Sequence, residues 1–361
     1  MAETANDNLN LKNTGGSLPV PNVQSLAASK EFTEIPGRYV RPEINDSPVL
    51  DSVAKHGDIP IIDLSRLDHL QHSNDEILKL SLACEDWGFF QVINHGVPDE
   101  VMEKVKVVIK EFFQLPLEEK KAYKQLPGTV EGYGQVFVVS EEQKLDWGDM
   151  YFLSTEPVSG RNLKLWATNP PTFKDALEQY TQEIRRVANI LLESIEKSLK
   201  LDKFFSMFES GVQSVRINYY PPCPQASKVL GLSPHSDAVG LTVLLQVNEA
   251  QGLQIKKNGA WLPIKPLPGA FIVNIGDIIE IMSNGKYKSI EHRAIVNTDR
   301  ERMSIATFHS PRADAQVGPL PAAVEKNKPH YKTISFQDYV RMLFSFKLEG
   351  KNILDHMKLE A

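Results

Sequence analysis

Three residues in the second half of the chain have the types and spacing of ligands for one metal ion. His235 and Asp237 are separated by a single residue, and His292 follows Asp237 by 55 residues. Residues i and i+2 of an extended segment point to the same face, so one strand end could present both side chains. Two imidazoles and one carboxylate, with coordination positions left open, are the ligand set of mononuclear non-haem iron centres. A His-x-Asp pair alone is also compatible with a solvated turn, and residues 231–237 contain turn formers, so the interpretation needs a second feature.

That second feature is an arginine and a hydroxyl that share one face of a predicted strand. Residues 302–308 read Arg-Met-Ser-Ile-Ala-Thr-Phe, and alternation places Arg302, Ser304 and Phe308 on the same side. Because the other side chains of this face are small or apolar, we expect the face, and Arg302 with it, to point into the interior of the protein. There the guanidinium fork and the serine hydroxyl would suit a carboxylate. If the Arg-x-Ser motif stood alone, a structural ion pair between the arginine and an Asp or Glu would be the better explanation. Beside a metal triad, we favour a bound carboxylate ligand.

A third predicted strand, residues 214–220, has the same alternation. Arg216, Asn218 and Tyr220 share one face, and the opposite face carries Val215 and Ile217. The polar face offers donors that suit small molecules rich in oxygen. Three prolines among residues 221–224 end the strand, because proline cannot donate to a ladder.

Together these motifs resemble the plant 2-oxoglutarate- and iron(II)-dependent dioxygenases. The resemblance runs from about Val20 to Leu354 and includes residues 59–63, 87–96, 276–277 and 283–285. Residues 131–135, 145–147 and 263–268 are most similar to the group that contains the senescence-related SRG proteins and the morphinan-alkaloid O-demethylases. The four motifs are specific to the superfamily, and the subgroup says less about the substrate.

The resemblance implies a role for each residue of the candidate site. It implies that iron(II) is bound by His235, Asp237 and His292. It implies that the distal carboxylate of 2-oxoglutarate is held by Arg302 and Ser304, with Asn218 and Tyr220 beside the cosubstrate. It places Phe308, Tyr133 and Phe137 near the organic substrate, and it leaves the role of Arg216 open.

The activity implied is oxidation of a small molecule by dioxygen, with decarboxylation of 2-oxoglutarate to succinate and CO2 and with ascorbate supporting activity. An aromatic side chain at position 308 favours a flat, largely apolar substrate over an amino acid or a sugar. We therefore expect hydroxylation or O-demethylation of an aromatic or polycyclic specialised metabolite, with desaturation and ring closure as alternatives within the family. A zinc hydrolase would need a general base and has no use for Arg302 and Ser304. A metal-free binding protein on the same scaffold is the other alternative.

Composition narrows the class of protein. A net charge of −6 gives no basic field for nucleic acid, and no apolar run approaches the roughly 20 residues of a membrane span. The first residues lack a basic region followed by an apolar one, which predicts no secretory signal. Cys84 and Cys223 are the only cysteines, and we expect free thiols. These observations predict a cytoplasmic protein that binds neither nucleic acid nor membrane. With the resemblance, we expect a monomer whose partner is a small aromatic molecule.

The order of elements predicts the architecture. A capping box at residues 73–76, Ser-x-x-Glu, should open a helix that Gly88 ends, and two further helices are expected around residues 101–112 and 175–199. From residue 212 to about 308 the hydrophobic period changes to two, with turns at residues 258–259, 276–277 and 284–285.

With the resemblance, this pattern predicts a mainly β protein with α-helices: a double-stranded β-helix, or jelly roll, buttressed by N-terminal helices and capped by a C-terminal helix. The predicted divisions are a disordered tail (1–16), a helical and mixed extension (17–205), the oxygenase core (206–315) and a helical cap (316–361). In the cap, Phe336, Tyr339, Val340 and Leu343 have helical spacing. They could close the mouth of the pocket or simply pack in the core.

Overall fold

A computed structural model describes most of the 361 residues. The described residues are 17–29, 34–45, 48–49, 58–68, 73–126, 129–135, 138, 140–325, 328–345 and 350–360. The expected tail of residues 1–16 lies outside this part of the chain, as does Phe137.

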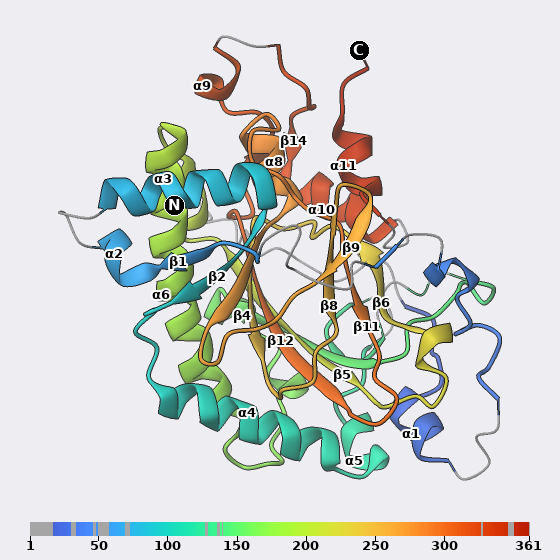
Figure 1. The fold of residues 1–361 in the computed structure, drawn as a ribbon. Coiled ribbons are helices and arrows are strands. Elements are labelled where there is room, and N and C mark those ends of the chain that lie inside the picture. Colours follow the sequence, from blue (N-terminus) through green and yellow to red (C-terminus); the bar gives the residue numbers. More distant parts are fainter. Residues whose placement is uncertain are drawn as a thin grey trace, which may run out of the picture.

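Two sheets form the centre of the molecule (Figure 1). In spatial order, the larger sheet contains β1 (Ile61–Asp63), β2 (Phe89–Ile93), β10 (Phe271–Ile275), β7 (Leu241–Gln246), β12 (Arg302–Ser310), β5 (Val212–Tyr220), β4 (Asp149–Glu156) and β3 (Gly132–Gly134). The smaller sheet contains β6 (Leu230–His235), β11 (His292–Ile295), β8 (Leu253–Lys257) and β9 (Ala260–Pro263). Except for the β1–β2 pair, neighbouring strands are antiparallel. The predicted jelly roll is confirmed.

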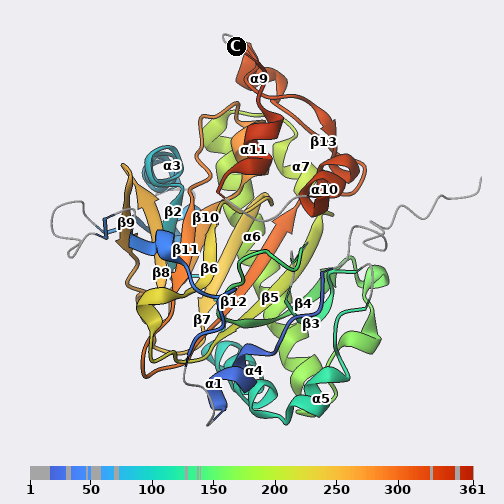
Figure 2. The same ribbon diagram turned by 90° about the vertical axis from the view of Figure 1, so that its right-hand side faces the viewer.

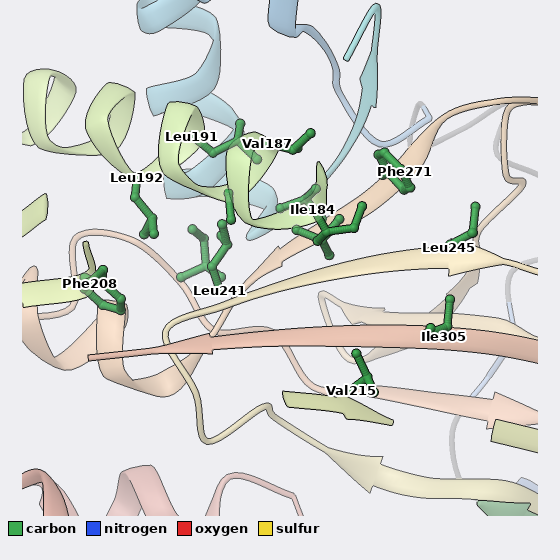
Figure 3. Close-up of a cluster of buried hydrophobic side chains, with 14 of the residues drawn as sticks. Ile184, Val187, Leu191, Leu192, Phe208, Val215, Leu241, Leu245, Phe271 and Ile305 are labelled. Atoms are coloured by element: carbon green, nitrogen blue, oxygen red, sulfur yellow. The ribbon is translucent and has the colours of Figure 1, made fainter. Parts of the chain in front are cut away.

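Helices from the first half of the chain cover the outer face of the larger sheet. They are α2 (Leu64–Asp68), α3 (Ser73–Leu82), α4 (Asp99–Gln114), α5 (Leu117–Lys121) and α6 (Phe173–Leu199), followed by α7 (Phe204–Phe208). Figure 3 shows how α6 packs: Ile184, Val187 and Leu191 on the helix meet sheet residues that include Leu241, Leu245, Phe271 and Ile305. All of these side chains are buried, and each large aliphatic one contributes about 1.5–3 kcal/mol through burial. This packing leaves the opposite face of the strands free to line a cavity.

The remaining elements lie at the two ends of the β-structure (Figures 1 and 2). At one end is α1 (Val23–Ala28), near α4 and α5; at the other are α10 (Phe336–Ser345) and α11 (Asn352–Met357). A small sheet of β13 (Gln316–Val317) and β14 (Ile334–Ser335) precedes α10, with α9 (Pro321–Val324) between its strands. No helix in the described chain is long and apolar enough to cross a membrane. The division between extension and core at residue 206 stays a prediction.

Two local predictions were wrong. Ser73 is the first residue of α3 and not its cap, and Glu76 accepts a hydrogen bond from the backbone N–H of Asp63 at 2.8 Å, so no capping box forms. The region of period two is interrupted by α8 (Asp277–Met282), whose residues are all buried and whose N-cap is Gly276. Burial on every side makes an isoleucine-rich helix look like a strand in sequence.

Other local predictions are confirmed. The helical segment that begins with α3 continues as a π-helical turn, η3 (Ala83–Trp87), and ends at Gly88 with a φ of +59°. A Cβ on Gly88 would lie 2.1 Å from the carbonyl oxygen of Lys288, so both conformation and space require glycine there. Asn258 and Gly259 form the two-residue turn between β8 and β9, with φ of +51° and +80°. Both cysteines are buried free thiols.

Candidate active site

The three predicted metal ligands converge at one end of the smaller sheet. His235 is the last residue of β6, His292 is the first residue of β11, and the two residues are direct partners in the antiparallel ladder. Asp237 follows the end of β6, and its Oδ1 lies 3.4 Å from Nε2 of His235 and 3.7 Å from Nε2 of His292. One possible ligand atom from each residue lies within 4.8 Å of the others, and all three residues are buried. This spacing can hold one metal ion.

Backbone carbonyls set the orientation of both imidazoles. Nδ1 of His235 lies 2.8 Å from the carbonyl oxygen of Ser233, and Nδ1 of His292 lies 3.2 Å from that of Ile290. A carbonyl oxygen only accepts, so each Nδ1 carries a proton and donates it. In the neutral form of each ring, Nε2 then has the lone pair and faces Asp237, which is the tautomer that a metal ligand needs.

The carboxylate of Asp237 is divided between two tasks. Its Oδ2 accepts hydrogen bonds from Oγ1 of Thr242 at 2.6 Å and from Nδ2 of Asn274 at 2.8 Å. This leaves Oδ1 facing the two imidazoles. Thr242 on β7 and Asn274 on β10 were not predicted from sequence, because nothing local relates them to the His-x-Asp motif. Sheet order, which joins β7 to β10, brings them to the site.

Electrostatics favour a charged Asp237 carboxylate beside a neutral His292 imidazole. Burial alone would raise the pKa of the Asp237 carboxyl, but the His292 and His235 rings and the Asn274 amide outweigh it and hold this pKa well below its usual range. Burial, followed by the neighbouring His235, lowers the pKa of His292 to about 4. Near neutral pH the site therefore presents the negative charge of Asp237 and an uncharged His292, and a carboxylate with imidazole nitrogens is a donor set that suits a divalent metal ion.

A second polar cluster lies on the larger sheet. In the ladder between β5 and β12, Arg302 is the partner of Tyr220 and Ser304 is the partner of Asn218, so the four residues form one patch. Arg302 is only 2% exposed, and its Nη2 donates to Oε1 of Gln246 at 3.1 Å. Its buried Nε has no hydrogen-bond partner in the described part of the chain, and its guanidinium lies 5.4 Å from the centre of the Tyr220 ring.

Arg302 has no ion-pair partner within 4.0 Å among the Asp and Glu residues that the structure describes. A buried guanidinium without a carboxylate costs free energy unless a ligand supplies one. The alternative of a structural ion pair at Arg302 finds no support in this geometry.

One cavity joins the triad to this patch. Its lining includes all three triad residues, the four polar residues of the β5–β12 patch, and Phe308, as predicted. The predicted alternation is confirmed, since Ser214, Arg216, Asn218 and Tyr220 all line the cavity from β5. Leu343 and Phe344 of α10 close part of its wall, whereas Phe336, Tyr339 and Val340 of the same helix belong to the core.

Tyr133 is placed differently from the expectation. It is not among the residues that line the cavity; its ring packs against Phe112 and Phe113, and its hydroxyl accepts a hydrogen bond from Asn22 at 2.7 Å. Tyr133 is the ladder partner of Tyr151, which stacks on Phe112, so it lies on the face of the larger sheet that the helices cover. Phe137 falls outside the described residues. Phe152 on the neighbouring β4 lines the cavity and was not predicted.

Family models match two segments of the chain. Residues 211–311 match the model of the 2OG-Fe(II) oxygenase superfamily, and residues 59–172 match that of the N-terminal region of non-haem dioxygenases in morphine synthesis. The chain belongs to the 2-oxoglutarate- and iron(II)-dependent oxygenases. It is therefore an oxidoreductase that uses iron(II) and 2-oxoglutarate, and the resemblance seen in the sequence is confirmed.

Relatives extend over almost the whole chain. S-norcoclaurine synthase 1 of Coptis japonica is 53% identical, over 97% of this chain and 99% of its own length. Codeine O-demethylase of Papaver somniferum is 44% identical, over 96% of this chain and 98% of its own length. Among solved structures, JOX2 in complex with 2OG, Fe and JA has a TM-score of 0.87 at 38% identity, covering 96% of this chain and all of that one.

The residues present fit the cofactors of this family. Two imidazoles and one carboxylate match the donors that iron(II) takes, and the buried Nε of Arg302, which has no hydrogen-bond partner among the described residues, matches a dicarboxylate that reaches the second cluster. These observations favour an oxygenase over the zinc hydrolase and the metal-free binding protein that the sequence left open.

Proposed function

We propose that the protein oxidises an aromatic or polycyclic specialised metabolite, by hydroxylation or O-demethylation. The observation that carries the proposal is the position of Phe308, which lines the same cavity as the metal triad together with the apolar side chains of Ala306, Leu244 and Leu253. An aromatic ring and aliphatic side chains beside the reacting centre suit a flat apolar molecule. The name of the relative from Papaver somniferum, an alkaloid O-demethylase, supports the same class.

Within this proposal the two polar clusters have separate tasks. His235, Asp237 and His292 hold iron(II), and Arg302 with Ser304 binds the distal carboxylate of 2-oxoglutarate through charge-assisted hydrogen bonds. Asn218 and Tyr220 border the cosubstrate. When bound, iron(II) and 2-oxoglutarate supply dioxygen activation coupled to formation of succinate and CO2.

The protein itself supplies placement and protection. Thr242 and Asn274 fix the Asp237 carboxylate, so the metal position varies little relative to the cavity wall. Phe308 and the aliphatic side chains set which C–H bond of the substrate lies nearest the metal. Leu343 and Phe344 shield the cavity from solvent, which limits turnover of 2-oxoglutarate without substrate.

We also infer a cytoplasmic monomer in which ascorbate supports activity. The two buried free thiols suit a reducing compartment, and ascorbate would keep the iron ferrous. Light scattering of the purified protein tests the oligomeric state.

The test is a screen for succinate release. The purified chain is incubated with iron(II), 2-oxoglutarate and ascorbate, and aromatic plant metabolites with and without O-methyl groups are added singly. We expect stimulation by a subset of these compounds, with a product heavier by one oxygen for hydroxylation or with formaldehyde for O-demethylation. Efficient turnover of a free amino acid or a peptidyl proline, with no response to any aromatic compound, would remove the proposal.

A further inference from the structure

Arg216, like Arg302, lines the cavity without an ion pair to any Asp or Glu residue that the structure describes. It lies on β5, on the face that lines the cavity, and its Nε is buried without a hydrogen-bond partner. Within the described part of the chain no Asp or Glu oxygen lies within 4.0 Å of this guanidinium. Other arginines of the protein show the usual pairing: Arg161 bonds to Glu178 at 2.8 Å, and Arg41 bonds to Asp146 at 2.9 Å.

Arg216 and Arg302, which both lack an ion pair with the Asp and Glu residues that the structure describes, stand at different places on the cavity wall. Arg302 is the ladder partner of Tyr220, whereas Arg216 is the partner of Ala306 on β12 and of Phe152 on β4. Arg216 and Tyr220 are four residues apart on one strand, which corresponds to about 13 Å along the sheet. Each arginine therefore has its own surroundings, and a cosubstrate carboxylate held at Arg302 and Ser304 leaves the charge at Arg216 without a counterion.

Both ladder partners of Arg216 are apolar: Phe152 on β4 and Ala306 on β12. Phe308 is a diagonal neighbour, Leu343 and Phe344 of α10 line the same cavity, and Ser214 and Asn218 are the polar neighbours on β5. A cation among apolar side chains interacts more strongly with an anion than it would in water, because the local dielectric is lower. Its planar fork matches the two oxygens of a carboxylate. The ligand that satisfies both features is an apolar body that carries one acidic group.

We propose that Arg216 binds a carboxylate of the organic substrate, so that the preferred substrates are flat, apolar carboxylic acids. This inference rests on the proposed function, because it assumes that the organic substrate occupies the end of the cavity beside Phe308. It narrows that function to acids among the aromatic or polycyclic metabolites, and it gives Arg216 the role of a specificity-determining residue.

The test compares acids with their neutral esters. The full chain is loaded with iron(II) and 2-oxoglutarate without oxygen, so that nothing turns over. Dissociation constants are then measured for methoxycinnamate and naphthoate and for the methyl ester of each. The proteins compared are the wild type, Arg216→Met, Arg216→Lys and Arg300→Met, the last at an exposed arginine outside the cavity.

In the wild type we expect each acid to bind about 10- to 100-fold more tightly than its ester, which is the range for a hydrogen bond to a charged group. Arg216→Met should reduce this ratio to near one, Arg216→Lys should keep part of it, and Arg300→Met should leave it unchanged. Equal binding of acid and ester by the wild type would overturn the inference, as would a ratio that survives in Arg216→Met. A loss of 2-oxoglutarate affinity in Arg216→Met, with the ratio intact, would assign the arginine to the cosubstrate instead.

The proposed function has a separate readout. Succinate formed by the wild type from iron(II), 2-oxoglutarate and oxygen reports on the oxygenase reaction itself. Aromatic substrates that are all turned over as neutral molecules would leave the proposed function standing and would remove only the role of Arg216.

Discussion

Ser236 and Gly350 are hydrogen-bonded through their backbones, although 114 residues separate them. The N–H of Ser236 donates to the carbonyl of Gly350 at 2.9 Å, and the N–H of Gly350 donates to the carbonyl of Pro234 at 2.8 Å. Ser236 stands between two of the candidate metal ligands, and α10, which lines the cavity, precedes Gly350 in the chain. The C-terminal cap is thus attached directly to the strand end that carries His235 and Asp237.

The ion pair next to this connection should stabilise the cap. Nζ of Lys351 lies 3.1 Å from Oε2 of Glu280, whose carboxylate is almost completely buried. Lys351→Met should lower the free energy of unfolding by about 1–3 kcal/mol, because it leaves a buried carboxylate with less compensation. Urea denaturation measures the change. Lys358→Met, which breaks an exposed pair with Asp355, should cost less than about 1 kcal/mol. Equal effects of the two variants would show that the buried pair does not hold the cap.

The hydrogen bonds to Asp237 should control iron affinity. Asn274→Ala and Thr242→Val each remove one donor to Oδ2, and such outer partners are worth about 10- to 100-fold in metal affinity. His292→Ala removes a ligand and should abolish iron binding and turnover. Titration of the metal-free protein with iron(II) under anaerobic conditions gives the dissociation constants. If the Asn274 and Thr242 variants bind iron like the wild type, their hydrogen bonds do not position the carboxylate.

Arg302 should control the Michaelis constant for 2-oxoglutarate. Arg302→Ala should raise it about 10- to 100-fold, because a hydrogen bond to a charged group is worth roughly 1.5–3 kcal/mol. Arg302→Lys should recover only part of the loss, since an ammonium cannot make a planar two-bond contact. Arg300→Ala, at an exposed position two residues earlier, is the control. An unchanged constant for 2-oxoglutarate, with weaker binding of the organic substrate, would reassign Arg302 to that substrate.

Phe308 should act on the organic substrate alone. Phe308→Ala should weaken substrate binding by about tenfold or more and increase succinate formation without product, since the substrate loses its contact with the wall. The Michaelis constant for 2-oxoglutarate should stay near the wild-type value. Phe205→Ala, at a half-buried phenylalanine of α7 outside the cavity, controls for a general loss of packing. Substrate kinetics unaffected by Phe308→Ala would contradict this interpretation of the pocket.

Asp149 should make stability depend on pH. It accepts hydrogen bonds from the backbone N–H groups of Val23 and Gln24, and burial raises its pKa from 3.8 to about 6. Between these two values the folded state binds one proton more than the unfolded state, so this group lowers stability as the pH rises from about 4 to about 6. The total change is about 3 kcal/mol.

Comparison of Asp149→Asn with the wild type isolates this effect. Because asparagine does not titrate, the stability of the wild type relative to the variant should fall by about 3 kcal/mol between pH 4 and pH 7. Urea denaturation of the metal-free proteins at several pH values measures the difference. Glu118→Gln, at an exposed carboxylate, should show no comparable trend. A constant difference between wild type and Asp149→Asn would show that Asp149 is charged throughout this range.

The inward faces of two strands could be predicted from sequence because alternation leaves little freedom. A slip of one residue on β12 would turn Arg302 and Ser304 into the helix-covered core and bring Met303 and Ile305 into the cavity. The metal ligands could be proposed because their chemical types are distinctive. Their pairing across β6 and β11 could not, since it depends on a ladder between distant segments.

The parts that sequence missed depend on long-range packing. Thr242 and Asn274 support Asp237 only because β7 lies beside β10 in the sheet. Tyr133 carries an aromatic ring of the expected type, but its register with Tyr151 on β4 places it on the helix-covered face, against Phe112 and Phe113. Glu76 follows the pattern of a capping residue, yet its carboxylate accepts a hydrogen bond from the backbone N–H of Asp63, which is distant from the start of the helix in sequence.

The order of strands in the larger sheet also affects how the chain folds during synthesis. β4 pairs with β5, and β5 pairs with β12, so the edge of β5 that belongs to β12 stays open until residue 310 has left the ribosome. Contacts between segments this far apart form slowly, and an open strand edge invites association with other chains. Expression at a lower temperature, or with chaperones that shield this edge, should therefore raise the yield of the folded protein more than a faster rate of translation.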